Sequence, residues 1–65
     1  MTQEERLIAF ERMLADLCTQ QAQTLEQLET LRAAGKEKTV RFRELLGQKL
    51  MLAQQIAIYE RYGLL

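Results

Sequence analysis

Two side chains in this 65-residue chain are candidates for catalysis, Lys49 and Cys18. Lys49 lies among apolar residues in a segment with helical periodicity, and a lysine held away from water can act as a base or a nucleophile. The alternative is that its stem covers apolar surface while the ammonium group reaches water or pairs with Glu26. Cys18 is the only cysteine and no histidine is present to serve as its base, so we interpret Cys18 as a small buried hydrophobic residue.

A basic cluster between residues 36 and 43 is the remaining candidate for a binding site. Residues 1–31 contain six acids and two arginines, a net charge of −4, whereas residues 32–49 contain six cations and two acids, a net charge of +4. Nucleic-acid binding normally requires a basic face or a groove-reading element, and this chain is neutral overall. We therefore favour a solvated, charged tip. The residues that would contact an anion or a nucleic acid are Lys36, Lys38, Arg41 and Arg43.

Other kinds of site find little support in the composition. One cysteine and no histidine leave too few ligands for a zinc site and no intramolecular disulfide. No phosphate-binding loop, acidic metal cluster or catalytic triad can be assembled, so we expect no metal, no cofactor and no enzymatic activity. The amino end is acidic and no apolar run approaches the length of a membrane span. These features predict a soluble, cytoplasmic protein with no membrane partner.

The first half of the chain has the pattern of one long helix. Thr2 and Glu5 form a capping box, and apolar residues then recur at spacings of three and four over more than three heptads, as in a helix that packs along a partner. Arg32 followed by Gly35 indicates a helix end, because a cation suits the last turn and glycine adopts the left-handed conformation that follows it. We expect a helix over about residues 3–34.

A second helix is predicted over about residues 39–62, with Thr39 as its N-cap and Gly63 after its last turn. The turn of about residues 35–38 is short, which favours an antiparallel helical hairpin. The alternative is one continuous helix through Gly35, at a cost of only about 1 kcal/mol, but it would leave both apolar seams dependent on other chains. The hairpin would bring Leu14 near Tyr59 and Thr24 near Lys49. Its expected core is Leu7, Phe10, Leu14, Leu17, Leu28, Leu31, Phe42, Leu45 and Ile56.

The second helix carries apolar residues on two opposite sides, and a helix with two apolar faces needs two partners. A chain of 65 residues also has little interior, and small proteins compensate by disulfides, metals or oligomerisation. We therefore predict an all-α fold with a single domain, residues 1–65, in which a coiled-coil-like antiparallel two-helix hairpin pairs as a homodimer into a four-helix bundle. The predicted dimer interface is Val40, Gly47, Met51, Gln54, Ile58 and Tyr62.

The function predicted from these features is that of a small, non-enzymatic protein that homo-oligomerises and serves as a protein-interaction or regulatory module. Its partners are expected to be a second copy of itself and another protein. The alternative is a regulatory module that binds RNA or DNA through the basic hairpin tip.

Overall fold

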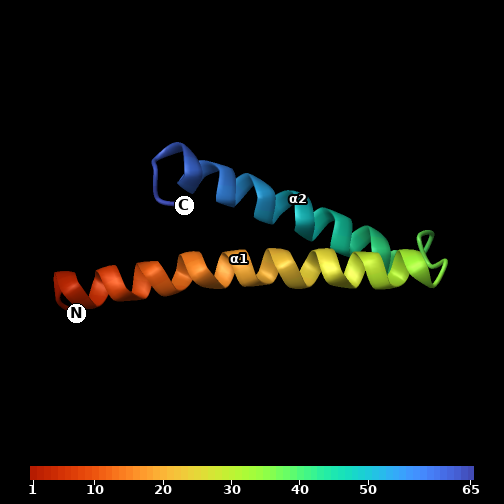
Figure 1. The fold of residues 1–65 in the computed structure, drawn as a ribbon, viewed down its shortest axis with the longest axis horizontal. Helices are drawn as coiled ribbons and strands as arrows, with labels where there is room; N and C mark the ends of the chain where they lie inside the picture. The colour runs from red at the N-terminus through yellow and green to blue at the C-terminus, as the bar shows by residue number, and fades with distance from the viewer.

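The computed structural model describes residues 1–65 and contains two α-helices packed against each other, α1 (Gln3–Ala33) and α2 (Val40–Arg61) (Figure 1). The helices run in opposite directions and are joined by a short turn, so the chain is a helical hairpin. Both helices begin and end within one residue of the bounds expected from the sequence. The alternative of one continuous helix is thereby excluded.

Both helices begin at a threonine that caps them. The Thr2 hydroxyl accepts a hydrogen bond from the amide of Glu5 at 3.1 Å, and the Glu5 carboxylate accepts one from the amide of Thr2 at 3.5 Å. The Thr39 hydroxyl accepts from the amide of Phe42 at 3.2 Å and donates to the carbonyl of Lys36 at 2.8 Å. Thr39 therefore satisfies a free amide at the start of α2 and also ties the turn to it.

Both helices end in a left-handed glycine. Gly35 and Gly63 have φ angles of +71° and +74°, which residues with a Cβ rarely adopt. The amide that follows each glycine donates to the carbonyl five residues earlier, at 2.8 Å after α1 and 2.9 Å after α2. These are Schellman motifs, and the second confirms the predicted end of α2.

The core lies along the line of contact between α1 and α2. Only seven of the 65 residues are buried, and each leucine among them stabilises the fold by about 1.5–3 kcal/mol. Leu52, which was not among the expected core residues, is one of the seven. The buried residues are Leu14, Thr24, Leu28, Phe42, Leu45, Leu52 and Ile56, and the expected core residues Phe10, Leu17 and Leu31 are half-buried.

Two sequence-based expectations about α1 are wrong. The 31 residues of α1 span about 46 Å and the 22 residues of α2 about 33 Å, so the amino end of α1 extends past α2 (Figure 1). Leu7, expected in the core, is 58% exposed because α2 does not reach it. Cys18 is exposed and not buried, because it lies on the flank of α1 rather than on the side that faces α2.

The middle of the hairpin contains a polar layer centred on Thr24. Thr24 is 1% exposed; its hydroxyl donates to the carbonyl of Gln20 at 2.8 Å and accepts from the side-chain amide of Gln48 at 3.2 Å. The expected partner was Lys49, which is half-buried and forms no ion pair with Glu26. Gln48 is thus the residue of α2 that meets the buried threonine.

The helices diverge towards their free ends (Figure 1), and aromatic side chains bridge the wider gap. The Phe10 and Tyr59 rings meet edge to face, with centroids 5.8 Å apart. From the sequence Tyr59 was expected level with Leu14, one helical turn further along α1. The ring of Phe10, which is longer than a leucine side chain, spans the separation there.

Candidate functional site

The side of α2 that faces away from α1 is exposed and largely apolar. We call it the outer face of α2; it contains the predicted dimer-interface residues. Its large hydrophobic side chains are between 49% and 72% exposed, so the hairpin itself gives them no partner. The outer face consists of Val40, Gly47, Met51, Gln54, Ile58 and Tyr62.

Gly47 lies in the middle of the outer face, and the hairpin does not require a glycine there. A Cβ atom added at this position would meet nothing within 4 Å. Glycine inside a helix costs roughly 0.5–1 kcal/mol relative to alanine. Gly47 was predicted to lie in a dimer interface, where a glycine lets a second backbone approach closely; any such contact lies outside this chain.

A second exposed apolar surface runs across both helices, and we call it the lateral face. Successive residues of a right-handed α-helix are turned by about 100°. Leu25 is roughly a quarter turn from the buried side of α1. The stripe of Leu46, Leu50, Ala53 and Ala57 is centred roughly a quarter turn from the buried side of α2. Both quarter turns are in the direction in which each helix winds from its N-terminus to its C-terminus. Because the two helices are antiparallel and face each other, a rotation in this direction leads to the same side of the hairpin from either helix. The lateral face consists of Leu7, Cys18 and Leu25 from α1 and Leu46, Leu50, Ala53 and Ala57 from α2.

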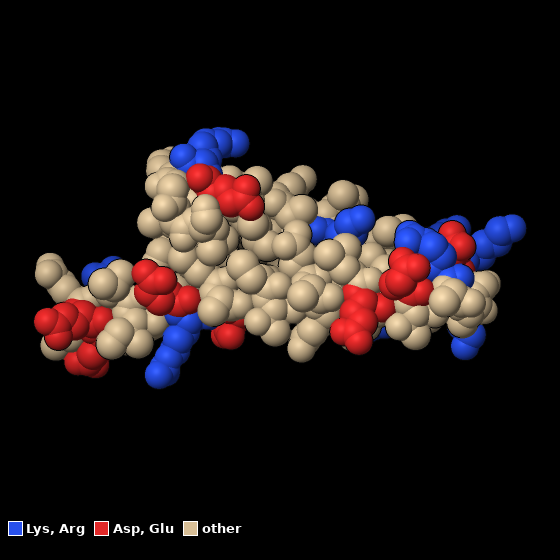
Figure 2. Space-filling view, in the orientation of Figure 1, with Lys and Arg blue, Asp and Glu red and all other residues tan.

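Figure 2 shows this side of the molecule. Its middle is mostly tan across both helices, apart from a blue side chain over α2, and the other red and blue side chains gather towards the ends and along the edge of α1. The signal for this surface was present in the sequence: Leu46, Leu50, Ala53 and Ala57 follow spacings of four, three and four, which is a heptad seam of its own. None of these four residues was predicted to lie in the hairpin core or in the dimer interface, so the separate seam was missed.

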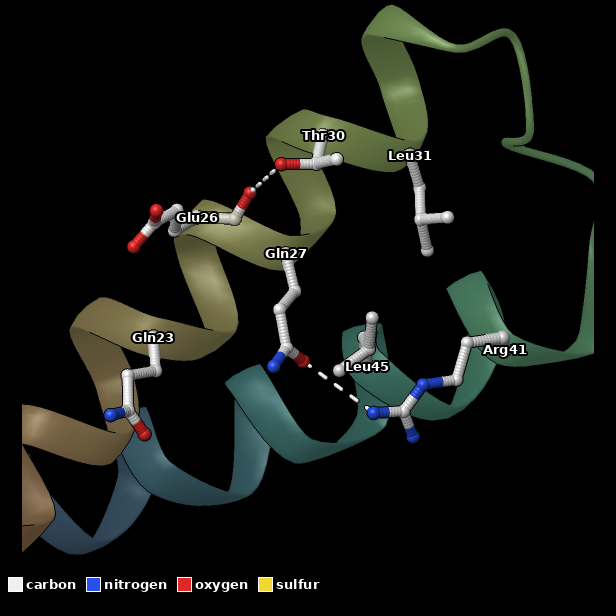
Figure 3. Close-up of a pocket in the computed structure, with 7 residues that line it drawn as sticks. All are labelled: Gln23, Glu26, Gln27, Thr30, Leu31, Arg41 and Leu45. Atoms are coloured by element: carbon white, nitrogen blue, oxygen red, sulfur yellow. Dashed lines mark hydrogen bonds between the residues drawn. The ribbon is translucent and has the colours of Figure 1, made fainter.

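The opposite side of the hairpin is polar and contains a groove of about 530 Å³ (Figure 3). Arg41 extends across it from α2 towards Gln27 on α1, and the two side chains are hydrogen-bonded at 3.5 Å. Thr30 bonds back to the carbonyl of Glu26 and leaves its methyl group beside the groove. No charged side chain is buried here, and the side chains of Gln23 and Glu26 extend into solvent without a partner in the chain. The groove lining is Gln23, Glu26, Gln27, Thr30, Leu31, Arg41 and Leu45.

Of the four cations expected to contact an anion, one is engaged within the hairpin and three are not. Arg41 is 3.6 Å from the carboxylate of Glu44 and reaches into the groove. Lys36, Lys38 and Arg43 form no ion pair and are exposed around the turn and the first turn of α2. Their arrangement is that of a solvated charged tip, with no cradle of backbone amides around it.

No three carboxylate or thiol side chains lie close enough together to hold a metal ion. Neither helix is long and apolar enough to cross a membrane. Comparison with protein-family models, with curated proteins and with solved structures finds no match for this chain. The exposed apolar faces are therefore the features from which a function can be argued.

Proposed function

We propose that this protein is a small, non-enzymatic helical-hairpin module that homodimerises into a four-helix bundle, and that the dimer presents a surface to another protein in a regulatory role. The observation that carries the proposal is the amount of apolar surface that one hairpin leaves in water. Twelve large hydrophobic side chains are exposed, against six buried hydrophobic residues in the core.

The accessible area supports the same conclusion. The hairpin exposes 5314 Å², whereas a compact monomer of 7.6 kDa would expose about 4,300 Å². The excess is about 1,000 Å², close to the roughly 800 Å² that each partner buries in a standard interface. Pairing of two hairpins would bring the area per chain to that of an ordinary compact protein.

The assembly is tested by sedimentation equilibrium at micromolar concentration. We expect a species of twice the 7.6 kDa chain mass, and a thermal midpoint that rises with protein concentration, because association stabilises the folded state by mass action. A folded particle of 7.6 kDa, with a midpoint independent of concentration, would contradict the proposal.

A further inference from the structure

We infer that the surface which receives the second copy is the lateral face, and not the outer face of α2; this inference rests on the proposed dimerisation. The first reason is the geometry of a bundle. The outer face is on the opposite side of α2 from α1, so a dimer formed there would place four helices in one flat layer. In a four-helix bundle the two neighbours of each helix lie about a right angle apart around its axis. Of the two apolar faces, only the lateral face lies at about that angle from the hairpin contact.

The second reason is the size of the side chains along α2. When two lateral faces pack with the hairpin tips at opposite ends, each α2 lies antiparallel to the α2 of the other copy. With the two-fold axis near Met51 and Leu52, Leu46 lies opposite Ala57 of the second copy, and Leu50 opposite its Ala53. A large side chain then meets a small one at every level, the arrangement that fills space between close helices.

The third reason is the register that this axis imposes on α1. The hydrogen bond between Gln48 and Thr24 shows which levels of the two helices correspond, so the axis crosses α1 between Gln20 and Gln21. The level of Leu25 of the second copy then lies within about 3 Å of that opposite Cys18 along the helix, which continues the apolar seam. At the same register Glu11, which has no cationic partner within the hairpin, faces a level within about 3 Å of Arg32 of the second copy.

Charge favours the same orientation. The N-terminal part of α1 is acidic and the hairpin tip is basic, with net charges of −4 over residues 1–31 and +4 over residues 32–49. When the two tips lie at opposite ends of the dimer, the acidic overhang of α1, which is its N-terminal part beyond the end of α2, lies beside the basic tip of the second copy. When the two tips lie at the same end, two basic clusters come together. In the favoured orientation every helix is antiparallel to both of its neighbours.

Two adjacent residues provide a matched test. Leu50 on the lateral face is 64% exposed in the hairpin and Met51 on the outer face is 57% exposed, so glutamate at either position is compatible with an isolated hairpin. We expect Leu50→Glu to raise the dimer dissociation constant by at least about 100-fold, because two carboxylates become buried near the two-fold axis. Met51→Glu should change it by less than about threefold. Both constants are measured by sedimentation equilibrium, with circular dichroism as the check on helicity.

Cross-linking of the native protein gives a second measurement that needs no destabilising change. In the lateral dimer the two Cys18 residues lie roughly 12 Å apart, from about 8 Å along the helices and one interhelical spacing. In a dimer formed through the outer face they are separated by about 25–30 Å, because both α2 helices lie between them. A bis-maleimide whose ends span only the shorter distance should link the wild-type dimer and the Met51→Glu dimer, and should leave the Cys18→Ala control unlinked.

The outcomes separate this inference from the proposed function. If Met51→Glu dissociates the dimer and Leu50→Glu does not, the inference about the lateral face is wrong, and the proposed dimerisation still stands. A wild-type monomer overturns both, and the lateral face then belongs to a different partner. Where both variants dissociate, or Leu50→Glu does not fold, the wild-type cross-link decides: a linked dimer supports the lateral face and its absence overturns it.

Discussion

Thr24 is the most deeply buried polar side chain of the hairpin, and its hydroxyl group has both of its hydrogen-bonding roles satisfied. It donates to a carbonyl of its own helix and accepts from Gln48 on the other. A buried hydroxyl with two partners contributes little net stability but strongly disfavours registers that leave it unpaired. We interpret the pair of Thr24 and Gln48 as a device that sets how the two helices align.

Thr24→Val should lower the free energy of unfolding by about 1 kcal/mol, because both hydrogen bonds are lost while the shape is kept. For a chain of this size that corresponds to a fall of roughly 4–8 °C in the melting temperature. Thermal unfolding followed by circular dichroism measures the change at one fixed protein concentration.

Thr30 offers the control for this substitution. Its hydroxyl makes the same bond to the carbonyl four residues earlier, at 3.0 Å, but the residue is exposed and has no partner on α2. Thr30→Val should change the stability by less than about 0.5 kcal/mol. Equal losses at both positions would show that the interhelical bond to Gln48 contributes nothing.

At the scale of the element, the two helices differ in what their glycines do. Gly35 ends α1 in a left-handed conformation at φ +71°, so the local backbone requires a glycine. Gly47 lies within α2 with open space around it, so the hairpin alone gives no reason for it. Substitution by alanine at the two sites should therefore have opposite effects.

Gly47→Ala should stabilise the protein by about 0.5–1 kcal/mol, because alanine is the better helix former and the added methyl group meets no atom of the chain. Chemical denaturation at constant protein concentration measures the change. A loss of stability together with weaker dimerisation would instead indicate that a second backbone approaches Gly47, as the interface predicted from the sequence requires.

Gly35→Ala provides the comparison, with an expected loss of about 1–2 kcal/mol from the left-handed backbone. Its effect should be the same at low and high protein concentration, because Gly35 lies in the turn and not on either apolar face. A neutral result would mean that the turn rearranges without cost.

For the molecule as a whole, the separation of charge is the feature that bears on partners other than a second copy. The tip is basic, but the acidic half of α1 makes the chain neutral, and three of the tip cations are exposed and form no ion pair. In the proposed dimer the acidic overhang of each copy also lies beside the tip of the other. Both features weaken the attraction of the tip for a polyanion.

We therefore expect only weak, non-specific binding of RNA or DNA at physiological ionic strength, measured by fluorescence anisotropy with a labelled single strand and a labelled duplex. A sub-micromolar complex whose affinity falls steeply with salt would support the alternative function instead. Reversing the charge of Lys36 and Lys38 together is the decisive variant, because these residues form no ion pair in the hairpin and should be dispensable for folding.

The sequence by itself determined the local features of this protein. Helix starts at Thr2 and Thr39 and helix ends at Gly35 and Gly63 could be predicted because a cap depends on hydrogen bonds between residues at most five positions apart. The antiparallel hairpin followed from the short turn. Most of the core followed from the heptad spacing, since that period fixes which residues share one side of a helix.

Only the tertiary structure decided what depends on the placement of one helix against the other. Leu7 is exposed because α1 is longer than α2. The alignment of the two helices pairs Thr24 with Gln48 and not with Lys49. Their antiparallel packing places the flanks that carry Cys18 and Leu50 on one side of the hairpin. A helical period gives the angle of each residue about its own axis and contains no information on the rotation, level or tilt of the neighbouring helix. The lateral face exists only once those three quantities are set.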